Sequence, residues 1–330
     1  MITRRDTLVA TLSAILAGKA GARKSPSCVL ILAPSNLGLR RNEDGTEPGT
    51  WRAPEILLGQ GLASRVKASG VWRLERPHYV DEAQQGSRIR NGPAIRSFSI
   101  ELAALVSKGV RKGLFPIVIG GDCSNLLGCL LGARQFGRAG LIHIDGHSDF
   151  LRPPSDSAAT ALSSAAGADL ALAIGRGEPL LTRWPQIDGP LVNDDDTAQI
   201  GERNALDPDF NKYYGDILTT RITRVLIQDV QRDGLPATVQ RIANWIERRG
   251  LGRLWLHVDL DVLDERDLPA VDSPGSPGLS YADLSAMIAG LRRTGAVLGV
   301  DFAIYDPDRD PKRIYAPRIV DCIARSVGMA

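Results

Sequence analysis

The sequence has little of several features that define a class of protein at once. Its four cysteines form no C-x-x-C pair, and a chain of 330 residues can bury enough surface to fold without disulfides. Aromatic residues make up only 5% of the chain and the formal net charge is +2, so no surface for nucleic acid is expected. No apolar run approaches the roughly 20 residues of a membrane span, so stable membrane insertion is not expected either.

The first 22 residues resemble an export signal. Residues 3–8 (TRRDTL) are similar to a bacterial twin-arginine motif, and an apolar stretch over residues 8–18 and the small-residue segment Lys19-Ala20-Gly21-Ala22 follow. We therefore expect a signal peptide at 1–22, a single catalytic domain at 23–330, and a periplasmic or otherwise exported protein. An ordinary amphipathic first helix in a cytoplasmic protein is the alternative.

Beyond residue 26, apolar runs alternate with amphipathic stretches. The runs predict strands at residues 28–33, 71–74, 114–119, 141–145, 222–228, 254–258 and 297–304. Helical spacing predicts helices at 54–68, 95–112, 126–135, 236–249, 281–293 and 312–327. The polar region 188–216 is expected to form long loops. This alternation indicates an α/β fold with a mainly parallel sheet that is covered on both faces, with its chemistry beyond the carboxyl ends of the strands.

The strand expected at 141–145 ends in a dense group of metal-ligand side chains. Asp145, His147 and Asp149 are spaced two residues apart, so they can converge on one point. Carboxylate oxygen together with imidazole suits Mn, Zn, Fe or Ni better than Ca or Mg. A polar turn with a chance D-x-H-x-D pattern is the alternative, but it would leave carboxylates that repel each other.

A second acidic group follows the strand expected at 254–258. Alternation puts Asp259 and Asp261 on one face, and the apolar residues around them indicate burial. Buried like charges need a cation or a proton, which favours a metal site over an acidic surface loop. His143 and His257, within the two strands, are expected to be buried hydrogen-bonded groups, with His143 on the face of Asp145 but deeper.

A third motif, Gly120-Gly121-Asp122-Cys123-Ser124, follows the strand expected at 114–119. A thiolate just before a helix is favoured by the helix dipole and can bind a metal ion. Taken alone, the motif is a weak signal, and a structural glycine turn is the default interpretation.

In order and spacing, GGDCS, DGHSD and HVDLDVLD resemble the metal motifs of the ureohydrolases, the family of arginase, agmatinase and formiminoglutamase. The resemblance extends from about residue 28 to the C-terminus and describes a divergent, GGDCS-type member. It implies a three-layer α/β/α sandwich, a homo-oligomer and two divalent metal ions, usually Mn²⁺. A metal-bridging hydroxide would then hydrolyse a non-peptide C–N bond in a small guanidino or amidine substrate.

The resemblance also implies roles for individual residues. Asp149 would be catalytic, because it would hydrogen-bond the hydroxide and accept its proton. Cys123 stands where the family usually has histidine, and its softer thiolate makes Zn²⁺ or Fe²⁺ the alternative to Mn²⁺. The ligands implied for one metal ion are Cys123, Asp145, Asp149 and Asp259. The ligands implied for the other are Asp145, His147, Asp259 and Asp261.

Two positions depart from the family pattern. This chain has Ala166 in place of a proton-shuttling histidine, and Ile304 in place of a glutamate that binds the guanidinium. Activity on unmodified arginine is therefore not expected. The alternatives to a hydrolase are a catalytically silent member, which keeps the metal site for structure or for a small ligand, and a metal-free interaction protein. The carboxylates that could replace the missing glutamate are Asp169, Asp301 and Asp306.

Overall fold

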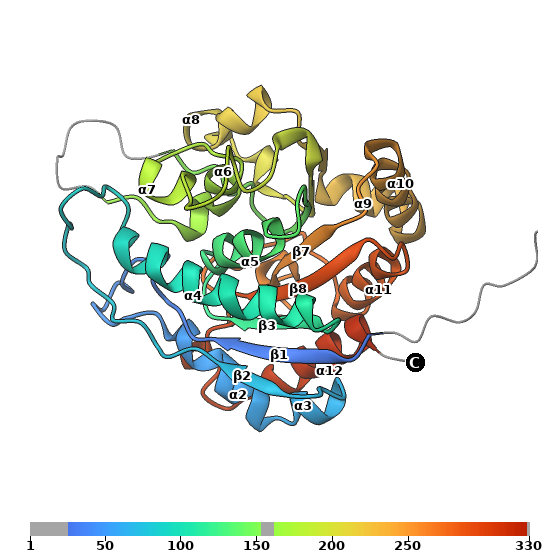
Figure 1. Ribbon diagram of the computed structural model, residues 1–330, viewed down its shortest axis with the longest axis horizontal. Helices are drawn as coiled ribbons and strands as arrows, with labels where there is room; N and C mark the ends of the chain where they lie inside the picture. The colour runs from blue at the N-terminus through green and yellow to red at the C-terminus, as the bar shows by residue number, and fades with distance from the viewer. Residues whose placement is uncertain (1–25, 153–161, 329–330) are drawn as a thin grey trace, which may run out of the picture.

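The computed structural model describes residues 26–152 and 162–328, so the expected signal peptide at 1–22 lies outside the described residues. The fold is built on an eight-stranded sheet with the strand order β2-β1-β3-β8-β7-β4-β5-β6 (Figure 1). Every pair of neighbouring strands is parallel. The strands are β1 (Cys28–Ala33), β2 (Val71–Arg73), β3 (Phe115–Gly120), β4 (Gly140–Ile144), β5 (Thr197–Ile200), β6 (Thr223–Val225), β7 (Leu254–Asp259) and β8 (Val297–Ala303).

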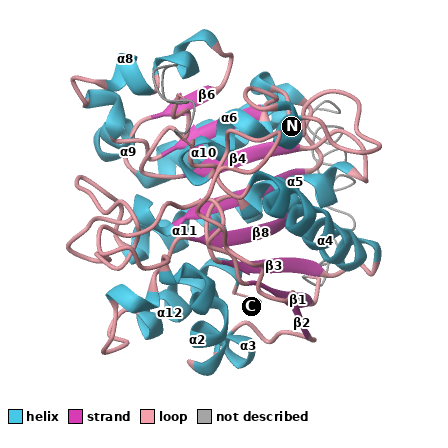
Figure 2. Ribbon diagram, turned by 90° about the vertical axis from the view of Figure 1, so that its left-hand side faces the viewer, coloured by secondary structure: helices cyan, strands magenta, loops and turns pink. Residues whose placement is uncertain are grey.

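Helices cover both faces of this sheet. Figure 2 shows α4 and α5 on one side of the strands and α11 and α12 on the other. The helices are α2 (Ala53–Gly59), α3 (Leu62–Arg65), α4 (Gly92–Arg111), α5 (Asn125–Arg134), α6 (Asp169–Ala173), α7 (Pro179–Thr182), α8 (Phe210–Tyr213), α9 (Ile227–Asp233), α10 (Leu235–Arg249), α11 (Tyr281–Arg292) and α12 (Ala316–Val327).

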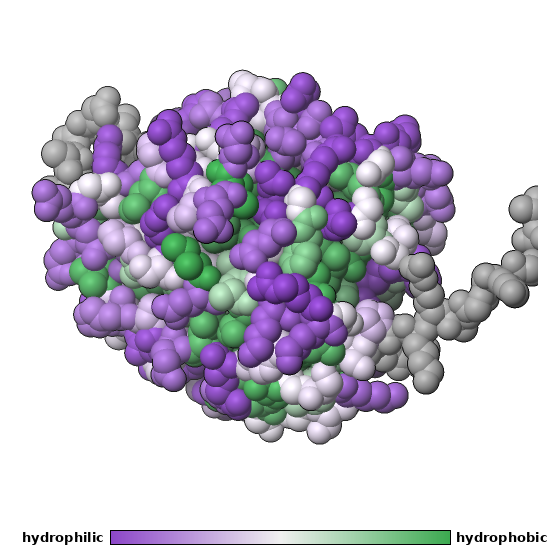
Figure 3. Space-filling model, in the orientation of Figure 1, coloured by the Kyte–Doolittle hydropathy of each residue, from purple (hydrophilic) through white to green (hydrophobic). Residues whose placement is uncertain are grey.

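Alternating side chains of the strands feed two separate hydrophobic cores. In β1, Leu30 and Leu32 pack in the core under α2, α11 and α12, whereas Ile31 and Ala33 pack in the core under α4 and α5. The three-layer α/β/α sandwich is thereby confirmed. On the face seen in Figure 3, hydrophilic side chains cover most of the surface and smaller hydrophobic patches lie between them.

Most expected elements are present, and the differences have local causes. Residues 54–68 form two helices rather than one, because Gly61 between them adopts a left-handed backbone with φ of 84°. The strand expected at 222–228 ends at Val225, and α9 begins two residues later. The expectation of long loops over 188–216 was wrong where β5 and α8 form. The strand β5 is short and partly polar, but all of its residues are buried between β4 and β6.

The register of the sheet places the sequence motifs side by side. Ile144 of β4 pairs with Val258 of β7, so Asp145 and Asp259 lie at the carboxyl ends of neighbouring strands, at the same edge of the sheet. Within the sheet, His143 pairs with His257, and His257 pairs with Asp301 of β8. No helix in residues 26–152 or 162–328 is long and apolar enough to cross a membrane.

Candidate metal centre

The loop after β4 presents the D-x-H-x-D motif at the carboxyl edge of the sheet. A Cβ atom on Gly146 would lie 2.3 Å from the guanidinium of Arg203, so glycine leaves room for that side chain beside the turn. Asp149 has a left-handed backbone with φ of 48°, a conformation that aspartate tolerates better than most residues. His147 N donates a hydrogen bond to Asp145 Oδ1 at 2.6 Å, which closes the turn and directs these side chains inward.

The glycine turn after β3 positions Cys123. A Cβ atom on Gly121 would lie 1.7 Å from the carbonyl oxygen of Ser35, so only glycine fits. Asp122 is turned away from the site and accepts a hydrogen bond from Ser35 Oγ at 2.6 Å. The buried Cys123 thiol donates to Asp259 Oδ2 at 2.6 Å. The motif is therefore both a structural glycine turn and the source of a thiol in the site.

Three of the expected ligands lie close together in the site, namely Asp145, His147 and Asp261. His147 Nδ1 lies 2.8 Å from Asp261 Oδ2 and 3.7 Å from Asp145 Oδ1. The ligand atoms of the three residues lie within 4.8 Å of one another. These residues are three of the four ligands expected for the second metal ion. The fourth, Asp259, is held in the same turn, where its Oδ1 accepts a hydrogen bond from Asp261 N at 2.7 Å.

The four ligands expected for the first metal ion are not brought together as one group in the same way. The described part of the chain contains three further triplets whose ligand atoms lie within 4.8 Å of one another. Each triplet includes two residues that were not expected to be ligands. These triplets are Cys123, Asp169 and His257; His143, Asp145 and His257; and His143, Asp149 and Asp169. All of the expected ligand roles, including those of Cys123, Asp149 and Asp259, therefore stay predictions.

The electrostatics of the centre fit a bound cation. Burial raises the pKa of Asp149 and Asp259, and neighbouring carboxylates, Asp145 and Asp261 among them, raise it further. Burial and the charge of Asp259 likewise raise the pKa of the Cys123 thiol. Asp145 Oδ2 is buried and has no hydrogen-bond partner. A divalent cation would relieve this repulsion and satisfy the free oxygen, and the nitrogen, oxygen and sulfur donors suit a transition metal.

A buried polar layer lies beneath these ligands. His257 Nδ1 lies 2.6 Å from Asp301 Oδ2, and Trp255 Nε1 donates to Asp301 Oδ1 at 2.6 Å. Burial opposes protonation of His257, but the charge of Asp301 outweighs it and raises the pKa of His257 to about 10. His143 stacks on His257 with ring centroids 4.8 Å apart, and its Nε2 lies 3.3 Å from Asp169 Oδ1. Both histidines are buried and have polar partners, as expected.

A cavity of about 830 Å³ opens above the centre, and Ala166 and Ile304 form part of its wall. Ile304 has φ of 75° and donates its backbone N–H to Gly121 O at 2.7 Å, so the wall is tied to the turn that holds Cys123. Neither position offers a polar side chain to a substrate. The ligands that line the cavity are Cys123, His147, Asp149, Asp259 and Asp261.

Asp272 is the carboxylate that the sequence analysis missed in this wall. It lines the cavity next to Ser273, in the segment that follows the HVDLDVLD motif. Among the described residues that line the cavity, none of the three carboxylates expected as substitutes for the glutamate is present. Asp301 binds His257 and Trp255, Asp306 accepts a hydrogen bond from Gly49 N at 3.1 Å, and Asp169 lies deeper.

Arg203 was also missed. Its guanidinium is buried, lies 3.7 Å from Asp261 Oδ1 and donates to the backbone oxygen of Asp261. It supplies positive charge behind a carboxylate of the centre. The available signal was the short strand β5, which places Arg203 at the carboxyl edge of the sheet but was not recognised as a strand.

The parallel sheet and the carboxylate, imidazole and thiol ligands beyond its strands define an α/β protein with a candidate metal centre. Comparison with known proteins gives the family: residues 42–327 match the model of the arginase family, and the chain belongs to that family. An arginase from Bacillus caldovelox is 31% identical over 273 residues, which cover 77% of this chain and 87% of that protein. Members of the family are hydrolases of guanidino C–N bonds.

Solved structures agree on the fold. The arginase from Bacillus cereus has a TM-score of 0.76 at 23% identity, and the match covers 92% of this chain and 99% of that one. The proclavaminate amidino hydrolase of Streptomyces clavuligerus has a TM-score of 0.64 at 17% identity, with 93% of this chain and 92% of that one covered. The expected resemblance to the arginase and agmatinase family is confirmed.

Proposed function

We propose that this protein is a binuclear metal-dependent hydrolase of a non-peptide C–N bond in a small guanidino, amidine or modified-guanidine compound. The observation that carries the proposal is the convergence of Asp145, His147 and Asp261 beside a cavity, next to the buried carboxylate of Asp149, whose pKa is raised by burial and by neighbouring carboxylates. Mn²⁺ is the expected metal ion, and Zn²⁺ or Fe²⁺ is the alternative because of Cys123.

Divalent cations in this centre would supply a water molecule of lowered pKa as the nucleophile. The role we assign to Asp149 is to orient that water and to accept its proton, because its carboxylate is buried and lines the cavity. His147 and Asp261 hold each other in place at 2.8 Å, so they enter the centre with a fixed geometry.

The cavity wall favours a substrate other than unmodified arginine. Ala166 and Ile304 present apolar surface where the family pattern has a histidine and a glutamate. Asp272 offers a carboxylate at a different place in the wall, and Arg40 and Lys212 also line the cavity. These charges suit a substrate that has a polarised C–N group at one end and an anionic group at the other.

The catalytically silent family member remains the second candidate. The observation in its favour is the same apolar pair, Ala166 and Ile304, because a site without a proton shuttle or a guanidinium clamp lacks two groups that assist turnover. Such a protein would use the metal centre for structure or for holding a small ligand.

A turnover screen distinguishes the two. The full chain, loaded in turn with Mn²⁺, Zn²⁺ and Fe²⁺, is tested for urea, amine or ammonia release on a panel of guanidino and amidine compounds. We expect at least one compound to be hydrolysed, and Asp149→Asn to lower kcat by about 100-fold or more. Two bound metal ions with no turnover of any compound would establish the silent alternative.

We also propose that the chain is exported through the twin-arginine pathway, on the sequence pattern of residues 1–22 alone. The full chain is expressed in a bacterium that has this pathway, and periplasm and cytoplasm are separated. We expect periplasmic protein, and loss of export when Arg4→Lys and Arg5→Lys are combined. Cytoplasmic retention of the unchanged chain would favour the alternative. A homo-oligomer also stays a prediction, to be checked by light scattering.

A further inference from the structure

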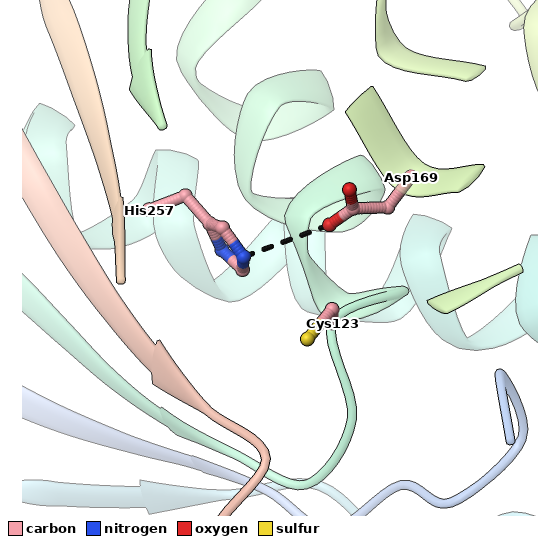
Figure 4. Close-up of side chains that lie close together, drawn as sticks. All are labelled: Cys123, Asp169 and His257. Atoms are coloured by element: carbon pink, nitrogen blue, oxygen red, sulfur yellow. Dashed lines mark ion pairs between the residues drawn. The ribbon is translucent and has the colours of Figure 1, made fainter. Parts of the chain in front are cut away.

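Three ligand-type side chains meet below the cavity floor and are not a set that the family pattern implies. Cys123, Asp169 and His257 come from the β3–α5 turn, the start of α6 and β7, and their ligand atoms lie within 4.8 Å of one another (Figure 4). His257 Nε2 and Asp169 Oδ2 are 3.6 Å apart. All three side chains are buried, and we refer to them as the deep triad.

The orientation of His257 is that of a metal ligand. Its Nδ1 lies 2.6 Å from Asp301 Oδ2, and Asp301 is fixed on its other oxygen by Trp255 Nε1 at 2.6 Å. A histidine that binds metal through one nitrogen commonly donates the other N–H to a carboxylate in this way. His257 Nε2 is buried without a hydrogen-bond partner and lies 3.6 Å from Asp169 Oδ2.

Asp169 supplies the second free group. Its Oδ1 lies 3.3 Å from His143 Nε2, whereas its Oδ2 is buried without a hydrogen-bond partner and faces His257. Two buried polar atoms that lie 3.6 Å apart and make no hydrogen bond are costly unless a proton or a cation lies between them. A cation between them would satisfy both atoms at once.

We propose that Cys123, Asp169 and His257 bind a Zn²⁺-type ion below the cavity floor. Ligands of a tetrahedral zinc ion lie about 3.5 Å from one another, which is close to the 3.6 Å between His257 Nε2 and Asp169 Oδ2. The set of one thiolate, one imidazole and one carboxylate is typical of zinc and suits Mn²⁺ poorly. The fourth position adjoins Asp259, which touches Cys123 at 2.6 Å.

This inference rests on the metal centre of the proposed function and changes the partners of Cys123. The deep triad replaces Asp145 and Asp149 as the residues that share an ion with the thiolate. Asp145, His147 and Asp261 remain a separate group at the cavity. The competing arrangement has no ion in the triad, and a protonated His257 lies between Asp169 and Asp301.

Cobalt provides the spectroscopic test, because a thiolate bound to Co²⁺ gives a charge-transfer absorption in the near ultraviolet. The full chain is titrated with Co²⁺ alongside Cys123→Ser, Asp169→Asn, His257→Gln and the matched control Asp149→Asn. We expect the absorption in the unchanged chain and in Asp149→Asn, and its loss in Cys123→Ser. In Asp169→Asn and His257→Gln we expect the Co²⁺ affinity that produces the absorption to fall at least tenfold.

The opposite pattern overturns the proposal: full absorption in Asp169→Asn and His257→Gln but loss in Asp149→Asn, or no absorption in the unchanged chain. If a variant does not fold, the position of the anomalous zinc signal in crystals of the Zn²⁺-loaded unchanged chain decides the question. A signal between the three atoms of the deep triad supports the proposal, and a signal against Asp145 and Asp149 refutes it. Urea release without the thiolate absorption would refute the deep triad alone, whereas the absorption without turnover would refute only the hydrolase.

Discussion

At Cys123 the type of a single ligand atom bears on which metal ion the centre prefers. The thiol is buried, and burial together with Asp259 raises its pKa, so it loses its proton only when a cation replaces that proton. Thiolate is a softer ligand than the histidine that the family usually has at this position. The preference between Zn²⁺ and Mn²⁺ should therefore depend on this residue more than on the carboxylates.

Cys123→His tests this dependence. We expect the variant to lose preference for Zn²⁺ over Mn²⁺ by about tenfold or more, because a neutral imidazole nitrogen replaces the soft, anionic thiolate. Metal content after dialysis against a mixture of the two ions is the measurement. Cys123→Ser serves as the size-matched control. Equal selectivity in the unchanged chain and in Cys123→His would mean that the thiolate does not bind the ion.

Among the secondary-structure elements, β5 shows how a polar residue fixes a strand that its own sequence barely specifies. Asp196, just before β5, is buried and accepts hydrogen bonds from Arg138 Nε at 2.7 Å and from Arg249 at 2.8 Å. Arg138 lies between α5 and β4, and Arg249 ends α10, so one carboxylate joins β5 to helices of both layers. Burial acts to raise the pKa of Asp196, but these hydrogen bonds outweigh it and lower the pKa to about 2.

Asp196→Asn should destabilise the protein in a pH-dependent manner. A lowered pKa in the folded state means that the carboxylate stabilises the fold above the unfolded value, and that this stability is lost as pH falls from about 4 to about 2. With allowance for the partly exposed arginines, we expect a loss of roughly 1–2 kcal/mol in the free energy of unfolding near pH 7. Urea unfolding across this pH range is the measurement.

The control for this prediction is Asp233→Asn, which removes an exposed ion pair with Arg232 at 2.7 Å. Its effect should be much smaller at every pH, because solvent screens such pairs. A destabilisation by Asp196→Asn that stayed constant down to about pH 2 would contradict the assignment of its effect to the charge.

For the whole molecule, the metal centre joins elements that are far apart in the chain. Its ligand-type residues come from the ends of β3, β4 and β7, and the deep triad adds the start of α6. Without a cation, the carboxylates of this centre repel one another, as the raised pKa values of Asp149 and Asp259 indicate. Metal binding should therefore stabilise the entire sandwich and not only the loops around the site.

Removal of metal ions by a chelator should lower the thermal midpoint of unfolding by roughly 5 °C or more, because a ligand that binds only the folded state adds its binding free energy to stability. Calorimetry before and after chelation, followed by addition of Zn²⁺ or Mn²⁺, measures the effect. Asp261→Asn should show a smaller loss, because one ligand is already absent. An unchanged midpoint would support the metal-free interaction protein instead.

Local pattern was enough to predict most elements. Continuous apolar runs marked the five strands β1, β3, β4, β7 and β8 closely, because buried parallel strands have no polar side to interrupt the run. The local pattern failed for β5, whose four residues (TAQI) include threonine and glutamine. These residues are buried because neighbouring elements cover them and not because the strand itself is hydrophobic. The pattern also extended β6 into α9, because a short apolar run does not reveal where the backbone changes from strand to helix.

The sequence by itself indicated which ligand-type side chains the candidate centre contains, because the D-x-H-x-D and D-x-D motifs follow directly on apolar strands. Only the tertiary structure decided which of these groups meet. The register of three neighbouring strands aligns His143, His257 and Asp301, and the approach of α6 brings Asp169 beneath Cys123. Such contacts depend on strand order and layer packing, which no local pattern encodes.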